Sequence, residues 1–429
     1  MRMGGAVLVA VLYGILPAVQ IGVYLAGFPF ADAVDVVAFT ASIAAYHWMV
    51  ANVLLSLKLP VLQSALPYDL RVRIHILTTV GLAVFLTWHA VYTIFLKAML
   101  IDVVAWSLLV LFSGLVLLSV LWIPLPGLKT VRTGVLGVVR TGLLKSYDLL
   151  KTGHKALFLV LTCLTYVHLL QAHLLGVVPP WSAWGYHLLF AAAVVFYLGT
   201  RIHNRLLPRL EVRSVTLEGG IVRLGLGPHP RLRYRSGQFA FLRFELQGLR
   251  GEEHPFSFTS AHHEPKVGFA VRALGDFTSK LTHLRPGDRV RINGGFGNFR
   301  PRPGTEPLAL VGSGIGAAPL VSILKEVGRR EPDREVVCLI SVNRRAELVE
   351  EHELGKLAQS MPRLRLRVFV FEEDGELYGP ELLARELGEA SRYRFYLCSS
   401  QKVRTIVVSA LRSLGVPGRK IHFEAFTLG

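Results

Sequence analysis

The sequence predicts a multi-domain membrane protein, in which a six-helix transmembrane bundle precedes a small antiparallel β-barrel and an α/β domain with a parallel sheet. Three observations support this fold class. The chain has 429 residues, 52% of them hydrophobic, and all of its long apolar runs lie before about residue 203. Short alternating strands follow this point, and strands alternating with helices come after them. At roughly 100 to 200 residues per domain, the length fits several domains.

Six apolar segments are each long enough to cross a bilayer, which takes about 20 residues. The first segment follows Arg2, but its apolar stretch is too long for a signal peptide and five more follow. It is therefore expected to be a retained helix. The predicted spans lie near residues 5–27, 33–57, 74–96, 103–123, 155–177 and 183–203.

Basic residues indicate the orientation and the surroundings of the spans. Lys and Arg concentrate in the loops after the second, fourth and sixth spans, which places the N-terminus and the C-terminal half in the cytoplasm, with the helices in the plasma membrane. The net charge of +17 does not indicate nucleic acid, because many of these residues would lie beside anionic lipid. The lipid bilayer is the expected partner, and no obligate protein partner is expected.

Two spans carry histidines in the same pattern. His75 and His89 are 14 residues apart, as are His154 and His168. Fourteen residues of helix rise about 21 Å and return to within about 40° of the same face. Both spans run from the cytoplasm outward, so His75 should lie level with His154 and His89 with His168. Intramembrane ionisable residues indicate function by default.

Each level offers only two imidazoles, whereas zinc and copper sites usually take three or four protein ligands. Haem supplies four nitrogens itself and needs only two axial ligands. The four histidines are therefore predicted to ligate two b-type haems. The small side chains of Gly81, Ala83 and Thr87 would leave room for a macrocycle.

Other membrane histidines have simpler interpretations. His47 is expected to be a polar residue hydrogen-bonded inside the bundle. His173 and His187 are also 14 residues apart, but Pro179 and Pro180 interrupt the helix between them. That spacing is therefore treated as a coincidence. The three cysteines form no CxxC or CxxCH, so neither a disulfide framework nor covalent haem attachment is indicated.

The globular half should begin with a β-barrel. Its expected strands cover residues 212–219, 221–226, 238–244, 267–274 and 288–294. Strands near 307–313, 335–342, 364–371 and 394–400 then alternate with helices near 318–330, 346–360, 380–389 and 401–414, a pattern typical of a parallel sheet. The predicted domains are 1–205, 206–303 and 304–429.

The first turn of this parallel sheet reads "LVGSGIGAAPLVSIL". Gly312, Gly314 and Gly316 would let the backbone approach a pyrophosphate, and the helix that follows offers its N-terminal amides. A tight strand-to-helix turn without a ligand is the alternative. After the second strand, Arg344 and Arg345 replace the acidic residue that usually binds a ribose hydroxyl. This favours NADPH over NADH, although both could be ordinary surface arginines.

Two barrel segments also fit a nucleotide. Phe256 could stack on a flat ring and the hydroxyl of Ser257 could hydrogen-bond to it; alone, this segment would pass for an ordinary strand. Gly275, Thr278 and Ser279 lie at an expected helix start, which suits a phosphate group.

The motifs "HPFSFTS", "GDFTSKL", "GSGIGAAPLVSIL" and "YLCSS", in this order behind six spans with paired histidines, resemble the transmembrane NADPH oxidase and ferric reductase superfamily, and its prokaryotic oxidases in particular. The resemblance implies a ferredoxin-reductase-like module that binds FAD and NAD(P)H. Domain 206–303 would be the FAD-binding barrel, and domain 304–429 would bind the nicotinamide nucleotide.

The resemblance also implies roles for single residues. The FAD site would include His254, Pro255, Phe256, Ser257, Arg272 and Thr278. The nicotinamide-nucleotide loop would include Gly312, Gly314 and Pro319, with Cys398 near the nicotinamide and Glu424 and Phe426 near the flavin. The chain has Ser399 and Ser400 where the family usually has Gly-Pro, which alters the expected surroundings of the nicotinamide.

The implied activity moves electrons from cytoplasmic NAD(P)H through FAD and two haems to an acceptor outside. Dioxygen, giving superoxide, is the favoured acceptor, because the short outer loops offer no patch for a ferric chelate. Ferric-chelate reductase is the alternative. A haem-binding membrane sensor without turnover and a reductase tethered to inert helices are the remaining hypotheses.

Overall fold

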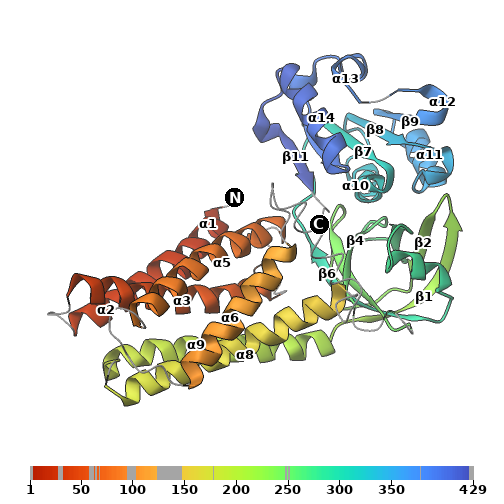
Figure 1. Ribbon diagram of the computed structural model, residues 1–429. Coiled ribbons are helices and arrows are strands. Elements are labelled where there is room, and N and C mark those ends of the chain that lie inside the picture. The colour runs from red at the N-terminus through yellow and green to blue at the C-terminus, as the bar shows by residue number, and fades with distance from the viewer. Residues whose placement is uncertain are drawn as a thin grey trace. The chain divides into compact units, whose positions relative to one another are not determined.

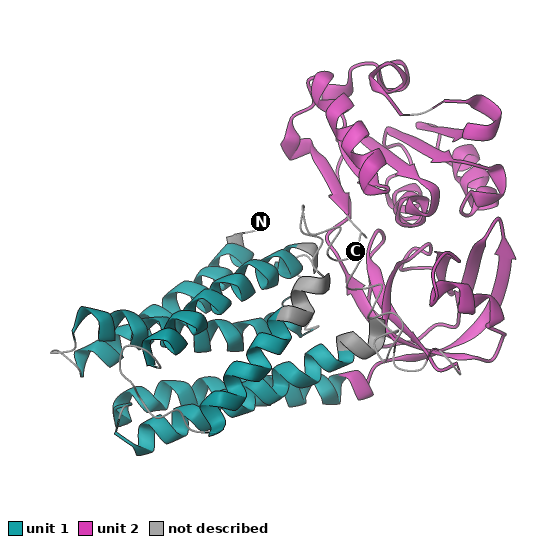
Figure 2. Cartoon of the chain, viewed as in Figure 1, with its two compact units in different colours: residues 1–203, 429 teal, residues 204–428 magenta. Residues whose placement is uncertain are grey.

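The chain divides into two compact units, residues 1–203 with 429 and residues 204–428 (Figure 2). The predicted division into three domains stays a prediction. The computed structural model describes residues 3–27, 32–57, 62, 65–66, 68–93, 103–122, 147–176, 178–246, 249, 252–376 and 378–424.

The first unit is helical (Figure 1). Its described helices are α1 Met3–Ala10, the π-helical turn η1 Val11–Ile15, α2 Leu16–Ala26, α3 Ala33–Ser56, α5 Tyr68–Val91, α6 Val103–Trp122, α8 Tyr147–Leu174 and α9 Pro180–Arg205. Five helical segments are long and apolar enough to cross a membrane: Gly4–Ala26, Ala33–Ser56, Leu70–Val91, Thr152–Leu174 and Pro180–Arg205. The fourth predicted span corresponds to α6, whose side chains are described over Val103–Val116, and its crossing stays a prediction.

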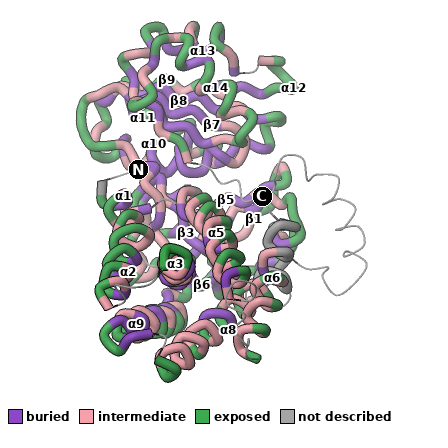
Figure 3. The backbone as a smooth tube through the Cα atoms, turned by 60° about the vertical axis from the view of Figure 1, so that its left-hand side comes forward, coloured by how far each residue is buried: buried purple, intermediate pink, exposed green. Residues whose placement is uncertain are grey.

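Large apolar side chains cover the outside of these helices. Val103 is 81% exposed and Leu77 is 72% exposed. Figure 3 shows many exposed and intermediate positions along α2, α5 and α8, whereas strands Leu308–Ser313 and Val336–Val342 of the second unit are mostly buried. Water would disfavour so much exposed apolar surface, and lipid would not. The first unit therefore has the surface of a membrane bundle.

Polar side chains link the helices inside the bundle. The amide of Gln20 on α2 donates to the hydroxyl of Ser182 on α9 at 2.9 Å. The hydroxyls of Tyr13 and Thr78 both donate to the side-chain oxygen of Asn52, at 2.7 and 2.9 Å. Interhelical hydrogen bonds of this kind hold membrane helices together where no hydrophobic driving force acts between them.

The second unit begins with a six-stranded antiparallel sheet of order β4-β3-β6-β1-β2-β5. Its strands are β1 Arg209–Glu218, β2 Ile221–Leu226, β3 Phe239–Phe244, β4 His254–Ser257, β5 Val267–Arg272 and β6 Arg289–Phe296. The segment after β4 meets β5 at a bridge between Phe258 and Phe269, and the N–H of Thr259 donates to the carbonyl of Gly268 at 2.9 Å. The two edges of the sheet thus approach each other; a fully closed barrel stays a prediction.

A five-stranded parallel sheet follows, in the order β11-β10-β7-β8-β9. Its strands are β7 Leu308–Ser313, β8 Val336–Val342, β9 Leu364–Val370, β10 Arg394–Cys398 and β11 Ile421–Glu424. The helices are α10 Ala317–Arg330, α11 Glu351–Ser360, α12 Phe371–Asp374, α13 Pro380–Leu387 and α14 Gln401–Ser413. One hydrophobic core joins the sheet to α10 and α11, and the other joins it to α13 and α14. The predicted parallel sheet with helices on both faces is confirmed.

Several elements differ from the sequence-based expectation. Strands β4 and β11 and the short helix α12 were not among the expected strands and helices. Helix α11 begins at Glu351 rather than near residue 346, because the backbone of Glu350 is left-handed (φ 55°) and a 3₁₀ turn covers Arg345–Glu347. The strand order reverses between β7 and β10, and ligands of such sheets bind at the carboxyl ends of the strands beside this point.

Candidate functional site

The structure brings the four predicted haem histidines together as two pairs between α5 and α8. The ring centroids of His75 and His154 lie 6.3 Å apart, and those of His89 and His168 lie 6.5 Å apart. The interplanar angle is 75° in both pairs. The helical spacing of 14 residues therefore does place one imidazole of each helix at each of two levels.

These separations fit axial ligation of one iron by each pair. A metal–imidazole bond is about 2.0 Å long, so two imidazoles on opposite sides of one metal ion have centroids about 6 Å apart. The Nδ1 atom of His89 is buried and has no hydrogen-bond partner among the described residues. A buried ring nitrogen without a partner is costly unless a bound group satisfies it, so this nitrogen is available to a ligand.

A cavity of about 920 Å³ adjoins the second pair. His89 and His168 both line it, together with aromatic and small side chains of α3, α5, α6 and α8. Pockets for cofactor-sized ligands are typically about 300 to 1,000 Å³ and mostly apolar. The space beside this histidine pair is therefore large enough for a macrocycle.

One of the three small residues expected beside the ligands has another role. Ala83 and Thr87 line the cavity, but a Cβ atom added to Gly81 would meet the indole ring of Trp48. Gly81 therefore allows close packing of α3 against α5, and the expectation that it leaves room for a macrocycle is wrong.

The other membrane histidines are also placed. The Nδ1 of His47 lies 2.9 Å from the carbonyl oxygen of Ile43, one turn earlier on α3, which confirms the interpretation as a hydrogen-bonded residue. The rings of His173 and His187, whose sequence spacing appeared accidental, lie 6.2 Å apart. Sequence reasoning missed this pair. The two rings are brought together by the reversal of the chain between α8 and α9, and not by the phase of a single helix.

In the second unit, the glycine loop adjoins the carboxyl ends of β7 and β10. Gly314 is left-handed (φ 54°), and a Cβ atom on Gly316 would meet the carbonyl oxygen of Cys398. Cys398 is paired in register with Gly312 on β7 and with Glu424 on β11. The predicted nucleotide loop, Cys398 and Glu424 thus share one edge of the sheet, where a nucleotide is expected to bind.

Cys398 is buried and free. Burial raises the pKa of its thiol, and the nearby Glu424 carboxylate raises it further. The thiol is therefore neutral at physiological pH. A Cβ atom on Gly297, in the turn after β6, would meet the carboxylate of Glu424, so Glu424 reaches the antiparallel sheet. The third predicted residue of this group, Phe426, lies outside the described residues, and Pro319 is buried in the first turns of α10.

Glu347 is a site residue that sequence reasoning missed. Its side chain is almost fully buried, and one carboxylate oxygen accepts from Arg272 at 2.9 Å and from Arg344 at 3.3 Å. Arg272 lies at the end of β5. Its guanidinium is close to the glycine loop, since a Cβ atom added to Gly314 would lie 3.7 Å from Nη1 of Arg272. Glu347 thus fixes two arginines that were predicted to bind phosphate groups.

Arg345 differs from Arg344 in its partners. Its guanidinium pairs with Glu351 at 3.1 Å and with Glu373 at 3.0 Å. Both arginines follow β8, as the sequence predicted for a group near the ribose. A 2′-phosphate that binds Arg345 would have to displace two carboxylates, those of Glu351 and Glu373. A 2′-phosphate that binds Arg344 would compete only with Glu347, so Arg344 is the more available cation.

Phe256 of the predicted FAD motif lies beside a second aromatic ring, that of Phe277, which sequence reasoning missed. The rings of His254 and Phe277 lie 3.8 Å apart, and Phe256 stacks on Phe277 at 6.4 Å. His254, Pro255, Phe256 and Ser257 form β4, which pairs with β3. Phe277 therefore joins the predicted FAD-binding motif to the segment that contains Thr278.

The expected helix start near Gly275 is a single 3₁₀ segment, Thr278–His283. The hydroxyl of Thr278 accepts from the N–H groups of Leu274 and Gly275, both at 3.0 Å, and the N–H of Ser279 donates to the carbonyl of Gly275. Thr278 thus organises a tight turn. The turn offers less of a helix N-terminus than the sequence suggested.

Comparison with known proteins defines the class of the second unit. A family described as an FAD-binding domain matches residues 209–287. One relative is the ferredoxin–NAD(P)⁺ reductase component of a naphthalene 1,2-dioxygenase/salicylate 5-hydroxylase system of Ralstonia sp.. It is 27% identical to this chain over 207 residues, and the alignment covers 46% of this chain and 61% of the relative. Residues 209–287 thus match an FAD-binding domain, and the chain is similar to a ferredoxin–NAD(P)⁺ reductase component.

Two further relatives are named as oxidases. Respiratory burst oxidase homolog protein A of Arabidopsis thaliana is 30% identical over 205 residues, 40% of this chain and 22% of the relative. Dual oxidase 2 of Sus scrofa is 30% identical over 156 residues, 33% of this chain and 10% of the relative. The chain spans less than two thirds of each of these three relatives. These matches support its place in the NADPH oxidase and ferric reductase superfamily.

Solved structures match the second unit at low overall similarity. The cytochrome P450 reductase GcoB of Amycolatopsis gives a TM-score of 0.47 at 24% identity, over 52% of this chain and 70% of that chain. A ferredoxin NADP⁺ reductase of Neisseria gonorrhoeae with bound FAD and NADP gives 0.45 at 19% identity, over 51% of this chain and 98% of that chain.

Proposed function

We propose that this chain is a transmembrane flavocytochrome b that moves electrons from cytoplasmic NAD(P)H, through FAD and two b-type haems, to an acceptor on the outer side of the plasma membrane. The favoured acceptor is dioxygen, giving superoxide. The observation that carries the proposal is the presence of two imidazole pairs between α5 and α8, at 6.3 and 6.5 Å, in the same chain as an FAD-binding module.

The cofactors would supply the electron chemistry: flavin accepts the two electrons of a hydride and passes them on singly, and haem iron accepts one at a time. The chain supplies position and insulation. His75 and His154 would hold one haem, and His89 and His168 the other. The exposed apolar side chains of the helices would keep water and ions away from both levels.

Residues of the second unit would bind and orient the two nucleotides. Arg272, held by Glu347 at 2.9 Å, would face the FAD pyrophosphate from β5. The left-handed Gly314 would let the loop approach the nicotinamide nucleotide. Cys398 would lie beside the nicotinamide as a neutral thiol, which adds no charge where a hydride leaves.

Glu424 would complete this group near the flavin. Its position in register with Cys398, and its approach to the turn at Gly297 of the antiparallel sheet, support a role between the two nucleotides. The serines that follow Cys398 enclose the start of α14, where the hydroxyl of Ser400 accepts from the N–H of Val403. Ser400 therefore caps helix α14 at one of the two positions where the family usually has Gly-Pro.

The nucleotide would be NADPH. Arg344 supports this preference, because it follows β8 and makes only one contact to a buried carboxylate. The cation could bind a 2′-phosphate, which NADH lacks. Arg345 is more firmly engaged by Glu351 and Glu373 and would contribute less.

Ferric-chelate reductase is the second candidate, because the same route could deliver electrons to iron. Dioxygen is favoured because the expected outer loops are short and carry few charged residues that could hold a ferric chelate.

The two candidates differ in the product of turnover. The purified full-length chain, loaded with FAD and haem, would be given NADPH in air with cytochrome c as reporter. We expect oxygen consumption and cytochrome c reduction that superoxide dismutase abolishes. Rapid reduction of a ferric chelate with negligible superoxide would instead establish the reductase.

A further inference from the structure

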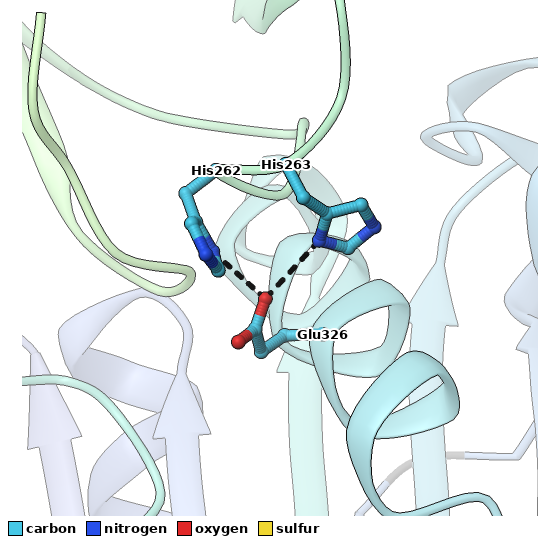
Figure 4. A group of neighbouring side chains, drawn as sticks. All are labelled: His262, His263 and Glu326. Atoms are coloured by element: carbon cyan, nitrogen blue, oxygen red, sulfur yellow. Dashed lines mark hydrogen bonds and ion pairs between the residues drawn. The ribbon is translucent and has the colours of Figure 1, made fainter.

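Three potential metal ligands converge in the second unit (Figure 4). The Nδ1 of His262 lies 2.9 Å from the Oε2 of Glu326, and the Nδ1 of His263 lies 3.3 Å from the same oxygen. All three ligand atoms lie within 4.8 Å of one another. The histidines belong to the turn between β4 and β5, and the glutamate belongs to α10.

This turn is held against α10 by further contacts. The hydroxyl of Ser322 donates to the carbonyl of Ser260 at 2.7 Å, and the ammonium of Lys325 lies 3.2 Å from the carboxylate of Glu264. Ser322, Lys325 and Glu326 lie three and four residues apart, so they share one face of the helix. The ligand atoms therefore come from two backbone segments that are already fixed to each other.

We propose that His262, His263 and Glu326 bind one Zn²⁺ ion, which ties the β4–β5 turn to helix α10. Zinc takes nitrogen and oxygen ligands at about 2.0 to 2.2 Å in a tetrahedron, which places neighbouring ligand atoms about 3.4 Å apart. The two measured nitrogen-to-oxygen distances, 2.9 and 3.3 Å, are near this value. Two imidazoles and one carboxylate suit a divalent transition metal, with water in the fourth position.

Two basic residues of α10 lie close to the cluster, and each is paired with a carboxylate. Arg330 binds the other oxygen of Glu326, Oε1, at 2.7 Å. It thereby orients the carboxylate and leaves Oε2 facing the two imidazoles, an arrangement found where outer residues position a metal ligand. Lys325 is paired with Glu264.

Metal binding would change one contact. The Nη2 of Arg330 lies 3.5 Å from the Nε2 of His262. Ligation through Nδ1 leaves the ring proton on Nε2, so this guanidinium contact would give way. The alternative is a pair of histidine–glutamate ion pairs without a metal ion, which needs no ligand geometry and leaves zinc unbound.

Equilibrium dialysis separates the two. The untagged, full-length chain with its flavin would be stripped with a chelator and then dialysed against micromolar zinc chloride near neutral pH, and bound zinc would be counted by mass spectrometry. We expect one zinc ion per chain, with more than about tenfold weaker binding in His262→Ala, His263→Ala and Glu326→Gln. The flavin content of each variant reports whether it is folded.

His352→Ala is the matched control, because His352 is exposed on α11 outside the cluster. It should bind zinc like the unmodified chain. Zinc K-edge absorption of the unmodified chain should show two imidazoles in the first shell. Equal zinc binding by the folded cluster variants and the control, or no bound zinc in the unmodified chain, would overturn the proposal.

Discussion

The imidazole rings of His89 and His168 lie 6.5 Å apart at an angle of 75°, on helices α5 and α8 and beside a cavity of about 920 Å³. This relationship repeats at His75 and His154 with nearly the same distance and angle. The same two helices thus carry two imidazole pairs of nearly equal geometry, which is the arrangement that the proposed binding of two haems would use.

Replacing His168 with Ala should remove one haem per chain and leave the other in place. The variant keeps the pair His75 and His154, so its haem content, measured as the pyridine complex, should fall from two to one per chain. His47→Ala is the control, because His47 hydrogen-bonds to its own helix and should not change the ratio. A His168→Ala variant that retains both haems would refute the assigned pairing.

Replacing Gly316 with Ala should disturb the nucleotide loop, because the added Cβ would meet the carbonyl oxygen of Cys398. We expect a destabilisation of about 1 to 3 kcal/mol and a raised KM for NADPH. Gly355→Ala is the control: Gly355 lies in helix α11 with nothing near its Cβ position, so the change should stabilise by about 0.5 to 1 kcal/mol. Equal changes in the free energy of unfolding for Gly316→Ala and Gly355→Ala would contradict the close approach of Gly316 to Cys398.

Replacing Glu347 with Gln removes the charge that holds Arg272 and Arg344. A hydrogen bond to a charged group contributes about 1.5 to 3 kcal/mol, so unfolding of the second unit should become easier by a similar amount. Glu351→Gln removes an exposed partner of Arg345 and should cost less than about 1 kcal/mol. Equal free energies of unfolding in urea for Glu347→Gln and Glu351→Gln would show that Glu347 does not stabilise the second unit through these two arginines.

Cys398 and Cys338 should react slowly with iodoacetamide in the folded chain. Burial raises the pKa of both thiols, that of Cys338 to about 12. Because these values exceed the unfolded value of about 8.5, the folded state keeps its protons and stability should fall as the pH rises above about 8.5. Peptide mass spectrometry should find both labelled only after unfolding. Fast labelling of native Cys398 would exclude the neutral buried thiol.

Replacing Arg344 with Ala should raise the KM for NADPH about tenfold or more while leaving that for NADH nearly unchanged, because only NADPH carries a 2′-phosphate. Arg345→Ala is the comparison and should have a smaller effect, since Glu351 and Glu373 already hold Arg345. Steady-state kinetics with both nucleotides gives the answer. Equal changes for NADPH and NADH would show that Arg344 does not recognise the phosphate.

Patterns within one element could be predicted from the sequence. The phase of a single helix places His75 and His89 on one face, and alternation of strands and helices gives the parallel sheet. Contacts between distant segments could not be predicted: His173 meets His187 through a reversal of the chain, and Glu347 meets Arg272 across two sheets. Gly81 was misjudged because the indole of Trp48, on another helix, occupies the space beside it.

Short elements were also hidden. Strand β11 has only four residues, and its place beside β10 is fixed by parallel pairing of Cys398 with Glu424 rather than by a local pattern. The candidate site residues of the second unit were predicted from their motifs and their roles stay predictions, whereas the residues that contact them became visible only in the fold.

The most direct test of the account is anaerobic addition of NADPH to the purified full-length chain loaded with FAD and haem, followed by the absorbance of both cofactors. If electrons pass from NADPH through FAD to two haems, we expect the flavin to be reduced and both haems then to become ferrous. The His168→Ala variant should lose the signal of one haem. A flavin that bleaches while the haems stay ferric would contradict it.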